Sequence, residues 1–337
     1  MRRTALFFGS VFIGLTVACA SPASLSTEKT TLRLAHNMNE SHPIHQSLLH
    51  FAELAEEKSE GALTFEIFPN GQLGSEREAI ELTQTGAVDA TKVSATALES
   101  FSPVYALFSI PYLFDGADHY YTVMESDIAT DIYDSTADNG FFGLTYYDAG
   151  IRNMYTIGTP IVAPEDLRGL KIRVQPSETA IEMTRLMGGA PTPMAFGEVY
   201  TALQQGVIDG TENNETALTS NNHGEVAKEY SYTEHAIVPD LLIFNQSRWE
   251  SFSPEEQRIL KEAALESSEF HKELWAAETA EAIARAEEMG VTFHEDVDKA
   301  AFRASVDPMH QQVKQDPDLA PFYERIQEMR KEGHTND

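Results

Sequence analysis

One arginine on a short predicted strand is well placed to bind an anion. The segment Lys171–Val174 alternates polar and apolar residues, so Arg173 projects opposite to Ile172 and Val174. Arg173 comes near the C-terminal end of this strand, shortly before Ser177, which can cap a helix whose N-terminus favours anions. A guanidinium matches a carboxylate with two parallel hydrogen bonds. The pattern therefore predicts carboxylate binding by Arg173, and a solvated or ion-paired surface arginine is the alternative.

Motifs of covalent and phosphate chemistry are missing from the sequence. It contains no nucleophile elbow, no phosphate-binding glycine loop and no CxxC pair. His36, His42, His45 and His50 are candidates for a metal site, but the last three span a predicted helix start, which favours surface or capping histidines. Since the chain has 53 acidic residues, no particular pair of carboxylates indicates acid–base catalysis. We therefore expect no enzyme activity, no metal and no cofactor.

Alternating strands and helices should position these residues. Period-two alternation predicts strands over 30–35, 63–67, 88–93 and 171–174. Helical spacing and caps predict helices over 44–61, 75–86 and 177–187. Strands that alternate with helices imply mostly parallel sheets.

Two segments of the chain share one pattern of helix, glycine and strand. Residues 78–91 match residues 198–211 in spacing and in most of the marked residue types, although such units also recur by chance. The match places 92–94 and 212–214 at the C-terminal ends of corresponding strands, where open parallel sheets bind ligands. We expect these two ends to face each other across a cleft.

The longest predicted helix begins at the capping box Ser253-Pro-Glu-Glu256 and continues to Gly290. About 35 helical residues span about 50 Å, which is enough to brace two lobes. A chain of 337 residues also exceeds the size of one typical core, so two lobes are expected. Trp275, within this helix, is expected in the core.

The first 20 residues have the three parts of an export signal. Two arginines precede an apolar run over 5–18, and Ala18-Cys19-Ala20 fits a cleavage site. A lipid anchor on Cys19, the only cysteine, is the less favoured alternative, because Thr16 stands where a lipoprotein signal usually has leucine. No later stretch approaches the roughly 20 consecutive apolar residues of a membrane span. We expect a soluble, exported, periplasmic protein without disulfides.

The charge balance limits the possible partners. The formal net charge is −29, and it becomes −31 when the two arginines of the signal are removed. Such a surface repels nucleic acid and serves solubility, particularly in a salty medium where screening is strong. An anionic ligand must therefore be held by local arginines. We expect a monomer that binds no nucleic acid.

Several segments resemble the solute receptors of tripartite ATP-independent periplasmic (TRAP) transporters. The resemblance covers nearly the whole chain after the signal, and the segments that carry it are Asn70–Arg77, Leu167–Val174, Gly189–Tyr200 and Val207–Asn214. It implies an α/β, two-lobed periplasmic binding protein fold of type II-like form, in which each lobe is a mixed sheet flanked by helices and a long helix spans the hinge. With this fold we expect lobe I to comprise 28–149 and 239–279, and lobe II to comprise 150–238 and 280–330.

The resemblance also implies roles for individual residues. Arg173 would form a two-bond salt bridge with the ligand carboxylate, and Arg152 and Asn213 would assist it. Phe196 would pack its ring on the ligand. Further positions that line the pocket in the sialic-acid-binding members are Asn37, Glu76, Lys92, Ser94 and Asp240.

The chain departs from the sialic-acid branch of this family. Ser94 replaces an acidic residue of that branch, and Asp240 replaces an amide, whereas the segments 91–95, 147–155 and 234–240 look like the branch with many hexuronate receptors. A uronate has one carboxylate for Arg173 and several hydroxyls, which need mixed donors and acceptors. A dicarboxylate would prefer a second cation, which only Lys92 could supply.

The resemblance therefore implies capture of a hexuronate, such as glucuronate or galacturonate, between two closing lobes and its delivery to membrane permease subunits. A receptor of the same family for C4-dicarboxylates or other carboxylates is the alternative. A secreted sugar-acid lyase or hydrolase and a ligand-binding partner of a membrane sensor are more remote alternatives.

Overall fold

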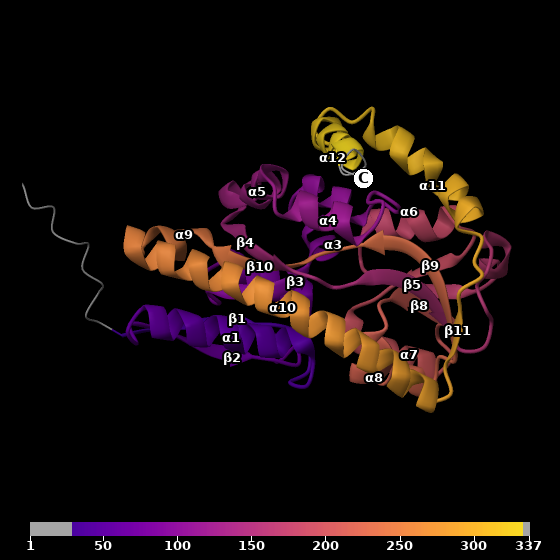
Figure 1. The fold of residues 1–337 in the computed structure, drawn as a ribbon, viewed down its shortest axis with the longest axis horizontal. Coiled ribbons are helices and arrows are strands. Elements are labelled where there is room, and N and C mark those ends of the chain that lie inside the picture. The colour runs from indigo at the N-terminus through magenta and orange to yellow at the C-terminus, as the bar shows by residue number, and fades with distance from the viewer. Residues whose placement is uncertain (1–28, 333–337) are drawn as a thin grey trace, which may run out of the picture.

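Two sheets form the framework of the molecule (Figure 1). The computed structural model describes residues 29–332, and the predicted export signal with Cys19 lies outside this range. The first sheet has the order β2-β1-β3-β10-β4, with strands Leu63–Phe68, Thr30–Ala35, Ala90–Ser94, Asp240–Asn245 and Phe141–Tyr147. The second sheet has the order β11-β9-β5-β8-β6-β7, with strands Thr292–His294, Glu229–Ile237, Ile151–Thr156, Gly210–Asn213, Lys171–Val174 and Ala190–Pro193.

Both sheets are mixed. In the first sheet β1 is parallel to β2 and β3, whereas β10 is antiparallel to β3 and β4. In the second sheet β6 is parallel to β7 and β8, whereas β5 is antiparallel to β8 and β9. Each sheet therefore has one strand, β10 or β5, that runs against all the others, so the expectation of mostly parallel sheets and the mixed sheets implied by the family resemblance are both confirmed. These two strands have the reverse direction because the chain reaches each of them directly from a strand of the other sheet: β5 follows β4, and β10 follows β9.

Helices cover both faces of these sheets and begin at the predicted caps. Ser75, Ser177 and Ser253 each accept a hydrogen bond from the first turn of their helix. The α-helices are α1 Pro43–Lys58, α2 Glu76–Gln84, α3 Ala95–Leu98, α4 Ala117–Met124, α5 Asp127–Asp134, α6 Glu178–Leu186, α7 Val199–Gln204, α8 Thr216–Ser220, α9 Gln246–Glu250, α10 Pro254–Glu288, α11 Lys299–Val313 and α12 Ala320–Glu332. Short 3₁₀ helices span Pro103–Ser109, Ala137–Asn139, Pro164–Leu167, Phe196–Glu198 and His223–Glu225. Within residues 29–332, no helix is long and apolar enough to cross a membrane.

The long helix α10 reaches from one sheet to the other, as predicted. It contacts α1 and β4 beside the first sheet and α8 beside the second, and it passes along both in Figure 1. His271, in its middle, donates a hydrogen bond from Nε2 to the Asp148 carbonyl at 2.7 Å. Asp148 precedes Gly150, where the chain crosses between the sheets with φ +66°. A Cβ atom on Gly150 would lie 3.1 Å from the Trp275 ring, so α10 is closely fitted against this crossing.

The repeated sequence pattern corresponds to a repeated structural unit. The Asp89 carboxylate accepts a hydrogen bond from the Arg33 backbone at 2.7 Å, and the Asp209 carboxylate accepts one from the Lys171 backbone at 2.7 Å. The glycine that ends each helix has a positive φ. The unit therefore ties each central strand, β3 or β8, to its parallel neighbour, and it brings the C-terminal ends of β3 and β8 to one region.

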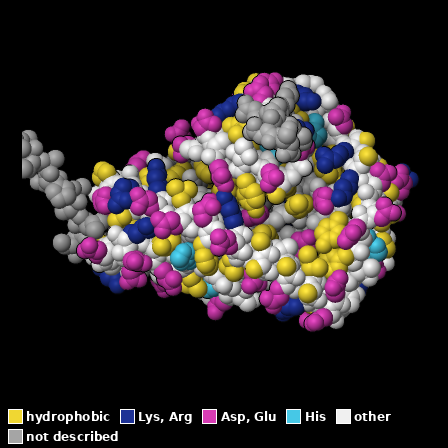
Figure 2. All heavy atoms as spheres, in the orientation of Figure 1, with side chains coloured by type: hydrophobic (Ala, Val, Ile, Leu, Met, Phe, Trp, Pro, Cys, Tyr) yellow, Lys and Arg dark blue, Asp and Glu magenta, His cyan; other side chains and the backbone are white. Residues whose placement is uncertain are grey.

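The C-terminal segment contacts the layers of both sheets. Helix α11 contacts β9 and α6. Helix α12, within the range predicted for lobe II, instead contacts α4 and α5, and Arg325 reaches Asp131 at 2.8 Å. Acidic side chains are spread over the face shown in Figure 2 among fewer basic ones, which fits the net charge of −29.

Candidate ligand-binding site

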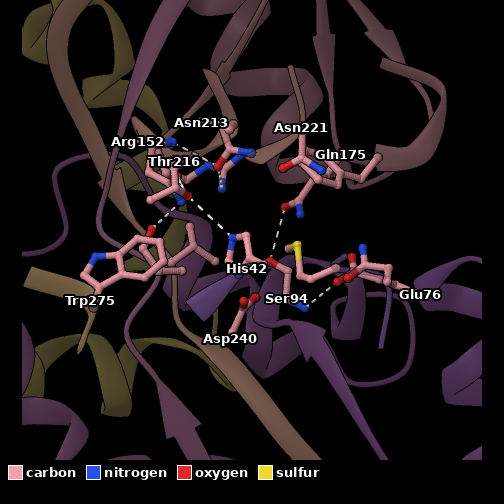
Figure 3. A pocket seen from close by; sticks show the side chains of 17 residues that line it. His42, Glu76, Ser94, Arg152, Gln175, Asn213, Thr216, Asn221, Asp240 and Trp275 are labelled. Carbon is pink, nitrogen blue, oxygen red and sulfur yellow. Dashed lines mark hydrogen bonds between the residues drawn. The ribbon is translucent and has the colours of Figure 1, made fainter. Parts of the chain in front are cut away.

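A polar cavity lies between the C-terminal ends of β3 and β8 (Figure 3). The volume open to the centre of a water molecule is about 30 Å³. Seven predicted site residues line it: Asn37, Glu76, Ser94, Arg152, Phe196, Asn213 and Asp240. Arg173 lines an adjoining cavity that shares Asn37, Glu76 and Phe196, and Lys92 lines a third beside Glu76. The structure thus brings all nine predicted residues around one region.

Arg173 is a buried cation that no acidic side chain of the described chain pairs with. Its side chain leaves β6 with 1 % of the residue exposed. Nε and Nη2 both donate to the Met194 carbonyl, at 3.1 and 3.0 Å, and the guanidinium carbon lies 5.7 Å from the centre of the Phe196 ring. Burial lowers the pKa of Arg173 to about 10. The group is therefore charged at neutral pH and has its remaining hydrogen-bonding capacity free for an anion.

The helix N-terminus near Arg173 is already occupied. The Glu99 carboxylate accepts hydrogen bonds from the Ser177 hydroxyl at 2.6 Å and from the Thr179 backbone at 3.1 Å. The expectation that the start of α6 would favour the ligand anion is therefore wrong, because a carboxylate of the protein satisfies these donors. Glu99 ends α3, the short helix that follows β3 of the first sheet, and α6 follows β6 of the second, so this contact also joins the two sheets.

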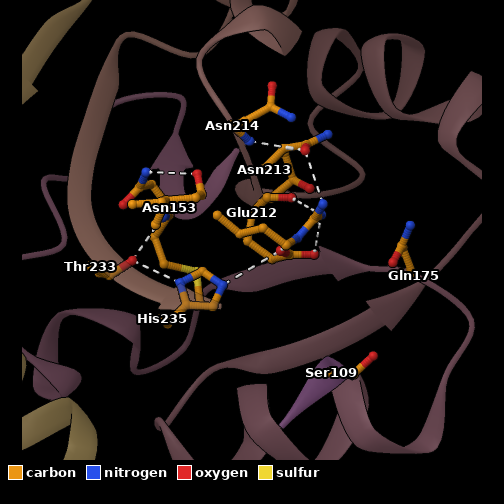
Figure 4. A network of polar contacts seen from close by, with 12 residues as sticks. Ser109, Asn153, Gln175, Glu212, Asn213, Asn214, Thr233 and His235 are labelled. Carbon is orange, nitrogen blue, oxygen red and sulfur yellow. Dashed lines mark hydrogen bonds and ion pairs between the residues drawn. The ribbon is translucent and has the colours of Figure 1, made fainter. Parts of the chain in front are cut away.

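Arg152 has an internal counter-ion in Glu212, which lies near Asn213 and His235 in Figure 4. Its Nε lies 2.5 Å from the Glu212 carboxylate, and its Nη1 donates to Asn213 Oδ1 at 3.0 Å. His235 Nε2 lies 3.5 Å from the same carboxylate. Burial alone would raise the pKa of Glu212, but the attraction of Arg152 prevails and lowers this pKa to about 2. Arg152 is therefore neutralised by its neighbour and fixes the orientation of Asn213.

Lys92 is enclosed by two carboxylates on the opposite side of the cavity. The residue is 0 % exposed, and Nζ lies 2.9 Å from Asp240 Oδ2 and 3.9 Å from Glu76 Oε1. Glu76 Oε1 also accepts a hydrogen bond from the Ser94 backbone at 2.9 Å. Burial raises the pKa of Glu76, against the attraction of Lys92. Glu76 and Asp240 line the cavity and Lys92 does not, so this side presents acceptors.

Other residues of the cavity were not identified from the sequence. They are Met38, His42, Ala149, Gln175, Asn214, Thr216, Ala217, Asn221, Val238 and Trp275. Gln175 directly follows β6, a position that could have indicated it, and it accepts a hydrogen bond from Ser94 Oγ at 3.4 Å. Trp275 is buried, as expected, with 5 % of the residue exposed, and it also lies at the cavity wall beside Gly150. The Oδ1 atoms of Asn37 and Asn221 are buried without a hydrogen-bond partner in the described part of the chain.

The four histidines near the N-terminus have separate contacts. His36 Nε2 lies 3.0 Å from His45 Nδ1, His42 caps α1, and His50 packs on Phe270 with ring centres 4.5 Å apart. Among residues 29–332, no group of three or more histidine, cysteine or acidic side chains is arranged to hold a metal ion.

The buried carboxyl of Glu215, next to Asn214, predicts a pH dependence of stability. The residue is 8 % exposed, and burial raises its pKa to about 7. This pKa lies above the value of about 4.3 in the unfolded chain. The contribution of the Glu215 carboxyl to the stability of the folded state is therefore complete at pH 4 and is lost as the pH rises through 7. Between pH 4 and pH 8, the free energy of unfolding of Glu215→Gln should therefore rise by about 3 kcal/mol relative to that of the wild type. Urea unfolding at both values measures this, and a difference independent of pH would contradict it.

Two α/β lobes with a polar cavity between them define the class of this molecule as a solute-binding protein. The chain belongs to family 7 of the bacterial extracellular solute-binding proteins, whose model matches residues 34–316. It is 46 % identical over 315 residues to the uncharacterized protein YiiZ of Salmonella typhimurium, covering 93 % of this chain and 96 % of that one.

Solved structures agree with this family. A TRAP periplasmic solute-binding protein from Anaerococcus prevotii with bound D-glucuronate superposes with a TM-score of 0.88 and 42 % identity, over 90 % of this chain and 99 % of that one. A TRAP protein from Xanthobacter autotrophicus with bound β-D-galacturonate gives 0.84 and 35 %, over 88 % and 98 %. The resemblance to TRAP receptors and the two-lobed fold are thereby confirmed.

Proposed function

We propose that the protein captures a hexuronate, such as glucuronate or galacturonate, and delivers it unchanged to TRAP permease subunits in the membrane. The observation that carries this proposal is the buried Arg173 guanidinium, which has no carboxylate partner within residues 29–332, whereas the nearby cations Lys92 and Arg152 are paired. A ligand carboxylate would supply the missing charge through two charge-assisted hydrogen bonds, each contributing about 1.5–3 kcal/mol before ordering costs. No catalytic step is required.

The charges of the cavity favour one carboxylate over two. Lys92 was the candidate partner for a second carboxylate, but Asp240 and Glu76 already enclose it. A second ligand carboxylate would meet these two acidic groups. Sugar hydroxyls can instead donate to them and to the Oδ1 atoms of Asn37 and Asn221, which have no hydrogen-bond partner among the described residues. The bound glucuronate and galacturonate of the two related structures support the same choice.

Capture would occur by closure of the lobes in the periplasm, after removal of the export signal. Lobe I would comprise 28–149 with 239–279, and lobe II would comprise 150–238 with 280–330, except that α12 would move with lobe I because it packs on α4 and α5. A ligand that bridges Arg173 and Glu76 would lower the free energy of the closed state. The protein would act as a monomer.

A thermal-shift panel tests the ligand class. A ligand that binds only the folded state stabilises it by about 4 kcal/mol at a thousandfold excess over Kd. Hexuronates should raise the Tm, whereas aldonates, 2-oxo acids and four-carbon dicarboxylates should raise it less or not at all. A shift caused only by dicarboxylates would show that the uronate assignment is wrong. Chemical change of glucuronate during prolonged incubation would instead favour the lyase or hydrolase alternative.

A further inference from the structure

His42 caps helix α1 and faces the cavity (Figure 3). Only 4 % of the residue is exposed. Its Nδ1 accepts a hydrogen bond from the Ile44 backbone at 3.2 Å, and its ring centre lies 6.1 Å from that of Trp275. Nδ1 is thus used by the helix cap, and Nε2 has only a long contact of 3.5 Å, to Thr216 Oγ1 at the cavity wall.

The cap fixes which ring nitrogen of His42 carries the proton. Because Nδ1 accepts, the proton of the neutral ring lies on Nε2, which is therefore a donor. Burial, and next the positive charge of Lys92, hold the pKa of His42 well below its usual range. The side chain consequently offers one uncharged N–H group to the cavity.

This N–H group lacks a short partner in the described part of the chain. Its acceptor among the described residues is Thr216 Oγ1 at 3.5 Å, at the outer limit of a hydrogen bond. The Thr216 hydroxyl itself donates to Asn214 Oδ1 at 2.7 Å, which holds it in place. Buried donors normally make shorter hydrogen bonds than this one, so a ligand oxygen at the cavity wall could replace Thr216 Oγ1 as the acceptor.

The cavity also needs a donor on this side. Glu76 and Asp240 only accept while ionised, and the ammonium of Lys92 is enclosed between them. A sugar hydroxyl both donates and accepts, so a hydroxyl that donates to one of these carboxylates still has an acceptor site to fill. The Nε2–H group of His42 can fill it without attracting a second carboxylate.

We propose that His42 determines specificity by donating a hydrogen bond from Nε2 to an uncharged oxygen of the ligand, at the end remote from the carboxylate held by Arg173. The proposal rests on the proposed function, since it assumes a polyhydroxylated monocarboxylate in the cavity. It gives His42 a role in recognition that neither a metal ligand nor a helix cap would have.

Two matched variants separate the cap from the donor. In His42→Asn the amide oxygen can replace Nδ1 as the cap, but no atom reaches the position of Nε2. In His42→Gln the amide nitrogen can reach that position as a donor, while the cap is lost. Calorimetric titration with D-glucuronate should show affinity reduced about 10-fold for His42→Asn, as for loss of one hydrogen bond, and within about 3-fold of wild type for His42→Gln. The Tm without ligand should follow the opposite order.

The outcomes are distinguishable. Wild-type affinity in His42→Asn would overturn the role of His42 while leaving the proposed function intact. An equal loss in both variants would also overturn it, because a donor at the Nε2 position would then not matter. If the wild type binds no hexuronate, the proposed function fails first and the His42 proposal fails with it.

Discussion

Replacing Arg173 by lysine should remove most of the affinity for a carboxylate ligand and leave the protein folded. The guanidinium uses Nε and Nη2 on the Met194 carbonyl and still has N–H groups for a carboxylate. An ammonium is a compact point charge that cannot reproduce this planar arrangement. The loss of at least one charge-assisted bond of about 1.5–3 kcal/mol corresponds to roughly 10-fold to 100-fold weaker binding. Calorimetric titration with D-glucuronate measures it.

Two further variants control this result. Arg185→Lys changes an exposed arginine on α6 that pairs with Glu182, and it should bind as the wild type does. Arg173→Met removes a buried cation that has no carboxylate partner among the described residues, so without ligand its Tm should not fall below that of the wild type. Affinity retained in Arg173→Lys would take Arg173 out of the central role.

Replacing Lys92 by methionine should destabilise the protein more than any surface change. The substitution leaves Asp240 and Glu76 buried without the cation that lies between them. Removing one partner of a buried ion pair typically lowers the free energy of unfolding by about 3–5 kcal/mol, because an uncompensated charge remains. Urea unfolding at pH 7 should show a lower midpoint with little change in slope.

The double variant Lys92→Met with Asp240→Asn tests whether the uncompensated carboxylates cause this loss of stability. It removes the cation together with one carboxylate, so it should recover a large part of the lost stability. Lys58→Met is the matched control, because Lys58 pairs with Glu266 at 2.8 Å on the surface and should contribute no more than about 1 kcal/mol. A double variant less stable than Lys92→Met alone would contradict this explanation.

Local signals sufficed to predict much of the fold. The capping boxes at Ser75 and Ser253 involve side chains three positions apart, and the helices begin where predicted. The repeated unit placed the ends of β3 and β8 correctly, because its helix, glycine and strand are local features. Family resemblance then supplied the mixed sheets, the positions of the nine residues and the two-lobed arrangement.

Pairing between distant residues could not be predicted. Lys92 and Asp240 are 148 positions apart, and Arg152 and Glu212 are 60 apart. No local sequence pattern indicates that these two cations have counter-ions, whereas Arg173 has none among the described residues. Glu99 occupies the start of α6 from 80 positions away, so the expected anion site there was wrong. The same reason explains why Asn221 and Trp275 were not identified at the cavity: only the folded chain brings their segments together.

The acidic surface shown in Figure 2 affects the rate of ligand capture. A protein with a net charge of −29 repels a small anion before the anion can reach Arg173. This repulsion acts over about 30 Å at 0.01 M salt but over only about 8 Å at physiological ionic strength. Dissolved salt therefore speeds the encounter, in contrast to receptors whose own field steers an anion inward. The electrostatic repulsion that slows association of an anionic ligand with this protein is therefore weakest in a saline medium.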